Sequence, residues 1–128
     1  MSGGKARVLV AEDDAHVAEL VAWALEPLDL EVVPARSGDD ALASIAACRP
    51  AAAILDLGLP GRSGLEVLER LRAAPETSRL PVLVLSARDG SLREAVEGLG
   101  AAFMSKPFDV DALAARVGAL LALPGGQA

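Results

Sequence analysis

The sequence predicts an α/β fold, an open parallel sheet with helices packed on both of its faces. Short apolar runs alternate five times with segments whose apolar residues recur every three or four positions, which is the order strand then helix. The apolar runs are nearly continuous, as expected for parallel strands covered on both sides. At 128 residues the chain has the size of one domain, and an open sheet suits that length better than a partial barrel.

The five predicted strands are short and largely aliphatic. They are expected over residues 8–11, 30–33, 51–55, 81–85 and 102–104. Pro81 is compatible with a strand because the first residue of a strand tolerates a missing N–H group. Since parallel strands point the same way, their carboxyl ends are expected at one edge of the sheet, where open α/β sheets bind ligands.

Helix boundaries follow from capping residues and from proline. Asp14 is a good N-cap for the first helix, which must end near Pro27. Ser37 caps the second helix, and Pro50 marks the end of that segment. The third helix follows the loop that contains Gly64.

The last two helices are bounded in the same way. The fourth covers roughly residues 91–99 and is stopped by Gly100. The fifth begins at Asp109 or Asp111 and ends before Pro124.

Composition excludes several classes of protein. The net charge of −6, from 12 basic and 18 acidic residues, argues against binding to nucleic acid, which needs a basic face. The single Cys48 excludes an internal disulfide and a zinc cluster built from cysteines. No run approaches the ~18 consecutive apolar residues of a membrane span, and the first residues do not form a signal peptide. We therefore expect a cytoplasmic protein that does not enter a membrane.

Three carboxylates are expected at one edge of the sheet. Glu12 and Asp13 follow the first strand, and Asp56 follows the buried run 51–55. Crowded carboxylates repel each other and so recruit a cation. Oxygen ligands favour Mg²⁺ or Ca²⁺ over zinc. Asp13, Asp56 and one backbone carbonyl would suffice for Mg²⁺, with Glu12 reaching the ion through water.

Two further polar residues end strands at the same edge. Lys106 follows the fifth strand directly, and the acidic pocket is the polar place that its ammonium group needs. Pro107 can adopt a cis peptide bond, which would aim the lysine inward. The hydroxyl of Ser86 can donate to a phosphoryl oxygen or cap the fourth helix. Together these groups suit a metal ion and a phosphoryl group.

In this order the motifs resemble the CheY-like receiver domain of two-component response regulators. The matching stretches are Val-Leu-Val-Ala-Glu12-Asp13-Asp, Ile-Leu-Asp56-Leu-Gly-Leu-Pro60-Gly, Leu-Ser86-Ala-Arg and Phe103-Met-Ser-Lys106-Pro107-Phe. The resemblance covers about residues 5–123, where we expect one receiver domain with no output domain attached. It implies a three-layer, doubly wound (βα)5 flavodoxin-like fold with a five-stranded parallel sheet in the order 2-1-3-4-5.

The resemblance also implies residue roles at the acidic end. Asp56 matches the phosphoacceptor, and Asp13 matches the acid that binds Mg²⁺ directly. Glu12 matches its outer-shell partner, and the backbone carbonyl of Gly58 completes the metal site. Gly58 is smaller than the residue often found at this position, so we expect a phosphoryl group on Asp56 to be more open to water.

The same resemblance implies a switch. Ser86 matches the hydroxyl residue that follows the phosphoryl group, Lys106 matches the lysine that pairs with it, and Phe103 matches the aromatic that swings inward on activation. Phe103 lacks the hydroxyl of the tyrosine that can occupy its position. The segment between Ser86 and Lys106 is about two residues shorter than is common, so we expect a truncated fourth helix. Arg88 is expected to reach over the pocket and affect dephosphorylation.

The expected function is a phosphorylation-dependent signalling switch. A sensor histidine kinase or a histidine phosphotransfer protein would supply the phosphoryl group to Asp56. The face of the fourth helix, fifth strand and fifth helix would then change its contacts with a downstream protein target, and a homodimer is left open. The protein would assist its own phosphorylation and dephosphorylation without turning over an external substrate.

Three alternative functions compete with this expectation. A phosphatase of the haloacid dehalogenase type needs an acid two positions after the nucleophile, where this chain has Gly58. In a flavin-binding module, the acids Glu12, Asp13 and Asp14 would repel the flavin phosphate. A receiver-like module that binds proteins without phosphorylation stays open, because sequence alone does not exclude it.

Overall fold

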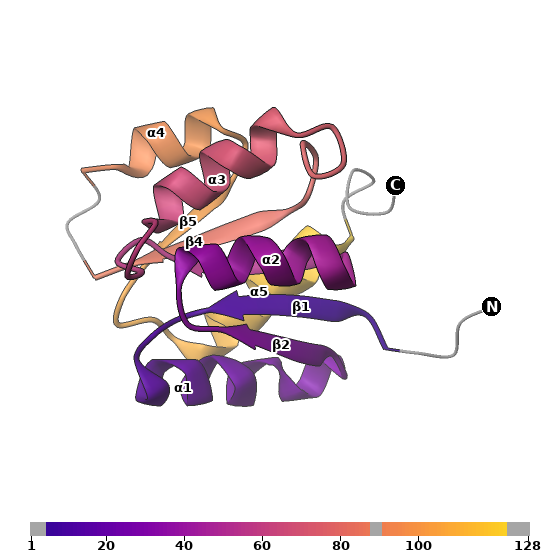
Figure 1. The fold of residues 1–128 in the computed structure, drawn as a ribbon. Coiled ribbons are helices and arrows are strands. Elements are labelled where there is room, and N and C mark those ends of the chain that lie inside the picture. The colour runs from indigo at the N-terminus through magenta and orange to yellow at the C-terminus, as the bar shows by residue number, and fades with distance from the viewer. Residues whose placement is uncertain (1–4, 88–90, 123–128) are drawn as a thin grey trace.

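In the residues that the structure describes, five parallel strands form one sheet in the order β2-β1-β3-β4-β5, which is the order that the resemblance implied. This arrangement comes from a computed structural model, which describes residues 5–87 and 91–122 (Figure 1). The strands are β1 (Arg7–Ala11), β2 (Glu31–Ala35), β3 (Ala52–Asp56), β4 (Val82–Ser86) and β5 (Ala102–Ser105). The helices are α1 (Ala15–Leu25), α2 (Gly38–Cys48), α3 (Gly64–Ala73), α4 (Arg93–Gly98) and α5 (Val110–Leu121), with a 3-10 turn, η1, over Glu26–Leu28.

Two layers of apolar side chains separate the sheet from its helices. Leu9, Leu55 and Val84 point to the layer shared with α2, α3 and α4. Alternate residues such as Ile54 and Leu85 point to the other layer, shared with α1 and α5. All five residues of β3 and of β4 are buried, as parallel strands require. Full burial of each such aliphatic side chain contributes roughly 1.5–3 kcal/mol, so the core holds the strand ends in register.

The observed element ends differ from the predicted ones in ways that have physical causes. The strand expected over residues 30–33 lies at Glu31–Ala35 and includes Pro34. Proline is accepted there because β2 is an edge strand, where a missing N–H group costs little. The strands expected over 51–55, 81–85 and 102–104 each end one residue later, so Asp56, Ser86 and Ser105 are their last residues.

The fourth helix is shorter than the predicted range 91–99. It spans the six residues Arg93–Gly98, compared with twelve for α5, which agrees with the expected truncation. Its N-cap is Leu92, which offers no side-chain hydrogen bond to the first turn. By contrast, the side chain of Asp14 caps α1 as predicted. In the described ranges 5–87 and 91–122, no helix has the length and apolar character to cross a membrane.

Candidate functional site

The three predicted acidic residues come together at the carboxyl edge of the sheet. β1 and β3 pair in register, with Ala11 opposite Leu55, so the residues that follow them are neighbours. One carboxylate oxygen from each of Glu12, Asp13 and Asp56 lies within 4.8 Å of the other two. Glu12 and Asp56 are only 4% and 6% exposed, whereas Asp13 is exposed. The site is therefore buried at Glu12 and Asp56 and open to solvent at Asp13.

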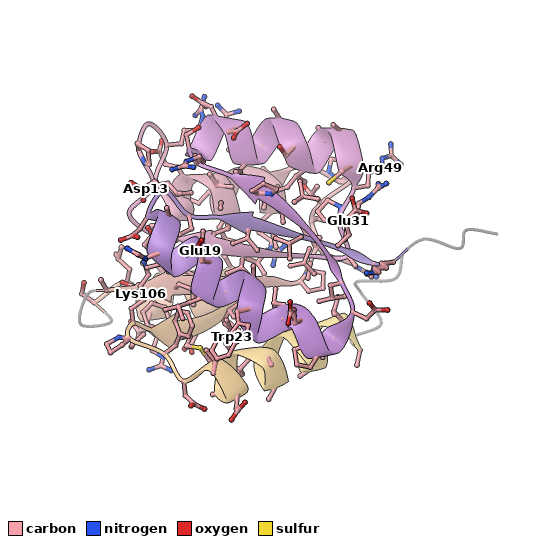
Figure 2. The ribbon with its side chains drawn as sticks, turned by 90° about the horizontal axis from the view of Figure 1, so that it is seen from below. Asp13, Glu19, Trp23, Glu31, Arg49 and Lys106 are labelled. Carbon is pink, nitrogen blue, oxygen red and sulfur yellow. The ribbon has the colours of Figure 1, made fainter. Side chains whose placement is uncertain are left out.

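Lys106 reaches into this acidic cluster, as the sequence predicted. Its Nζ lies 3.0 Å from Glu12 Oε1 and 2.9 Å from Asp56 Oδ1. Lys106 and Asp13 lie at the same end of the molecule in Figure 2. The backbone N–H of Lys106 donates to the carbonyl of Ser86 at 2.8 Å, which fixes the chain just after β5. The peptide bond before Pro107 is cis.

Charge and burial act in opposite directions within this cluster. Burial raises the pKa of Glu12, and the nearby charge of Asp56 adds to that effect, although the hydrogen bond from Lys106 acts against it. Burial on its own would lower the pKa of Lys106. Its hydrogen bonds to Asp56 and Glu12 outweigh burial, and its pKa is raised. Lys106 is therefore charged at neutral pH and offsets part of the negative charge.

Gly58 and Ser86 border Asp56 on two sides. A Cβ atom at Gly58 would lie 3.4 Å from Asp56 Oδ2, so this residue adjoins one oxygen of the carboxylate whose other oxygen, Oδ1, pairs with Lys106. Leu85 is the strand partner of Asp56, and the buried Ser86 follows it at the same edge. Arg88, which was expected to cover the pocket, lies outside the described residues.

Phe103 is buried in this structure. The residue is 2% exposed and belongs to the apolar layer shared with α3 and α4. Arg93 Cζ lies 5.2 Å from the centre of its ring, and Arg116 Nη2 donates to its backbone carbonyl at 3.2 Å. The Phe103 ring therefore lies inward in this structure. Neither arginine contact is predictable from the sequence, because both depend on how α4 and α5 pack.

The donor atoms of the acidic cluster fit a hard divalent cation. They are all carboxylate oxygens, which are the ligands that Mg²⁺ and Ca²⁺ prefer. One acid is exposed and two are buried, so an ion could share its coordination between protein and solvent. The cluster could therefore bind a metal of this class.

Fold and site together define a receiver domain, and sequence comparison agrees. The chain belongs to the response regulator receiver domain family, which it matches over residues 8–118. Receiver domains of two-component response regulators are phosphorylation switches that interact with histidine kinases.

Individual relatives support the same assignment. The phosphate regulon transcriptional regulatory protein PhoB of Rhizobium meliloti (strain 1021) is 40% identical over 118 residues, which is 90% of this chain and 52% of that protein. The chain thus spans about half the length of this curated relative.

Two solved structures resemble the fold described above. A proposed response regulator from Chloroflexus aurantiacus J-10-fl is 36% identical, with a TM-score of 0.87 over 94% of this chain and 100% of that one. The phosphorylated cyanobacterial phytochrome response regulator RcpA is 27% identical, with a TM-score of 0.78 over 91% of each chain.

Proposed function

We propose that Asp56 accepts a phosphoryl group from a phosphohistidine of a sensor histidine kinase or a histidine phosphotransfer protein. The N–P bond of the donor breaks and an O–P bond to the Asp56 carboxylate forms, while a solvent proton ends on the released imidazole nitrogen. The observation that supports this most directly is the contact of Lys106 with both Asp56 and Glu12 beside the Asp13 carboxylate. The phosphorylated state of the relative RcpA is consistent with it.

The residues of the site would act mainly by position and charge. Lys106 holds Asp56 Oδ1 and provides a positive charge for the incoming phosphoryl oxygens. Asp13, Asp56 and the backbone carbonyl of Gly58 would hold Mg²⁺, and Glu12 would contact it through water. When bound, Mg²⁺ would neutralise charge that develops on the phosphoryl group. The open side of Gly58 would leave the product accessible to water.

The response would pass to the face formed by α4, β5 and α5. An acyl phosphate on Asp56 would carry roughly −1.5 to −2 charge in place of the single negative charge of the carboxylate, beside Ser86, which can donate a hydrogen bond to it. Because the Phe103 ring already lies in the core, movement of α4 over the ring would be the visible change. Phosphorylation would thereby shift the population of two states with different affinities for a downstream protein.

Other aspects of the proposal follow from charge and chemistry. The net charge of −6 favours protein partners over nucleic acid. The protein would not be an enzyme with an external substrate, since its only turnover would be its own phosphorylation and dephosphorylation. A cytoplasmic location would give it access to the histidine kinase.

The test is intact mass after incubation with acetyl phosphate and Mg²⁺. The parent should gain one phosphoryl group, and Asp56→Asn should gain none because the nucleophilic carboxylate is gone. Asp111→Asn, which changes an exposed acid of α5, serves as the matched control and should behave as the parent. An unmodified parent would instead favour the phosphorylation-independent binding module.

A further inference from the structure

The loop that carries Gly58 is attached to the N-terminus of α2. The backbone N–H of Gly38, the first residue of α2, donates to the carbonyl of Pro60 at 3.3 Å. The next residue, Asp39, accepts a hydrogen bond from Arg62 Nε at 2.6 Å. This helix and this loop are about 20 residues apart in the sequence, so the two contacts join separate βα units.

Helix and loop approach each other too closely for a side chain at Gly38. A Cβ atom there would overlap the backbone oxygen and the Cβ of Arg62. The close approach therefore depends on glycine at this position. It also keeps the backbone of Arg62 against the first turn of α2.

The rest of the loop is anchored to the core. Leu57 and Leu59 are 9% and 6% exposed, and the N–H of Leu57 donates to the carbonyl of Leu85 at 2.9 Å. Gly58 lies between these two anchors and is exposed. The following stretch, Pro60 to Arg62, is the part of the loop that the core does not bury, and this is the part that α2 holds.

We propose that Gly38, Asp39 and Arg62 are positioning residues for the phosphoryl-accepting site. The N-terminus of α2 fixes the far side of the loop and so orients the Gly58 carbonyl toward the carboxylates. This inference rests on the function proposed above, which assigns that carbonyl to Mg²⁺. It adds three residues that lie outside the cluster of Glu12, Asp13, Asp56 and Lys106.

Arg62 allows the positioning role to be separated from simple electrostatics. Its guanidinium is a positive charge on a loop that borders an acidic site. Charge alone predicts that removing it strengthens Mg²⁺ binding. Loss of loop orientation predicts weaker binding, so the sign of the change distinguishes the two explanations.

The experiment measures the Mg²⁺ affinity of the unphosphorylated chain by calorimetry and by the amide resonance of Gly58. Arg62→Gln should weaken Mg²⁺ binding about threefold, which is the size expected for a partly exposed pair. The side chains of this pair are 34% and 72% exposed. The matched control is Arg7→Gln, which removes the same charge and breaks the exposed Arg7–Glu31 pair, and it should leave the affinity unchanged.

The Asp39 variants complete the cycle. Asp39→Asn should also weaken Mg²⁺ binding. The double variant with Arg62→Gln should bind Mg²⁺ no more weakly than the weaker-binding single variant, because both substitutions remove the same contact. Gly38→Ala should have a larger effect, roughly tenfold, because the backbone of the loop must move. If Gly38→Ala does not fold, the Arg62→Gln comparison decides by itself.

The outcomes separate this inference from the proposed function. Mg²⁺ binding by Arg62→Gln that equals or exceeds that of a Mg²⁺-binding parent would overturn the positioning role alone. A parent that binds no Mg²⁺ and gains no phosphoryl group would overturn both. Weaker binding with an unfolding midpoint that moves no more than that of Arg7→Gln would support positioning, since a purely structural role would move the midpoint further.

Discussion

The loop after β3 and the segment around α4 both follow strands at the carboxyl edge, but they are anchored differently. The first is held by two buried leucines, by α2 and by a capping box in which Ser63 and Glu66 exchange hydrogen bonds. The second is a six-residue helix whose one buried residue is Val96. Phosphoryl transfer would therefore occur beside the firmly anchored loop after β3. The conformational response would occur around α4, which has few contacts with the rest of the molecule.

Besides the buried Val96 in its middle, α4 has side-chain contacts at its two ends. At the C-terminal end, Arg72 donates to the carbonyls of Leu99 at 2.6 Å and Gly100 at 3.4 Å. At the N-terminal end, Arg93 lies over the ring of Phe103. Because each end of α4 is held by the contacts of one arginine, loss of one arginine's contacts would let that end move while the other stays in place.

The largest expected effect is on the free energy of unfolding, when one glycine beside the loop after β3 and one glycine in α4 are each replaced by alanine. Gly64→Ala should destabilise the protein by about 3 kcal/mol, because a Cβ atom there would overlap the backbone oxygen of Asp56. Gly98→Ala in α4 should be neutral or stabilise by up to about 1 kcal/mol, because no atom lies within 4 Å of its Cβ position. Urea unfolding followed by circular dichroism measures both. Equal effects of the two substitutions would contradict the comparison.

A smaller effect is expected at the C-terminal attachment of α4. Arg72→Gln should cost about 2 kcal/mol, because it removes charged hydrogen bonds to the carbonyls of Leu99, Gly100 and Leu80. Amide hydrogen exchange should become faster in α4 and stay slow in the loop after β3. Arg70→Gln, an exposed arginine of the same helix, is the control. Faster exchange throughout the molecule would mean that Arg72 supports the whole fold.

The smallest expected effect is the loss of the stabilising contribution of Lys106 at alkaline pH. The pKa of Lys106 is raised, so its stabilising contribution is complete below the ordinary lysine value of about 10.4 and is lost as pH rises through the higher native value. The chain has no tyrosine, and its other lysine is Lys5, which simplifies the titration. The unfolding free energy of the parent should fall in that range, and Lys106→Met should flatten the decline. A Lys5→Met variant that flattens it equally would refute the assignment.

The features that sequence predicted depend on local patterns. Apolar runs located the strand ends to within two residues, and parallel strands necessarily bring Asp13 and Asp56 to one edge, as the structure confirms. Lys106 was predicted to point into the acidic cluster because its charge needs a polar neighbour, and its ion pairs with Glu12 and Asp56 confirm this. These inferences needed the direction of the strands and no details of packing.

The features that sequence did not predict depend on packing between separate units. The contacts of Arg72 and Arg93 join α3 or β5 to α4, and no spacing in the sequence indicates them. The burial of Phe103 is set by the space between α4 and the sheet. β2 continues through Pro34, beyond its expected end, because it is an edge strand of the sheet. Its edge position follows from the strand order of the structure.

Trp23 has a consequence for optical spectroscopy. It is the only tryptophan of a chain without tyrosine, and it is 62% exposed on α1. Figure 2 shows it on the helix surface, well away from Asp13. Its emission should consequently change little when the protein unfolds but should shift to shorter wavelengths when another molecule covers α1, giving the protein a built-in fluorophore for detecting a bound partner.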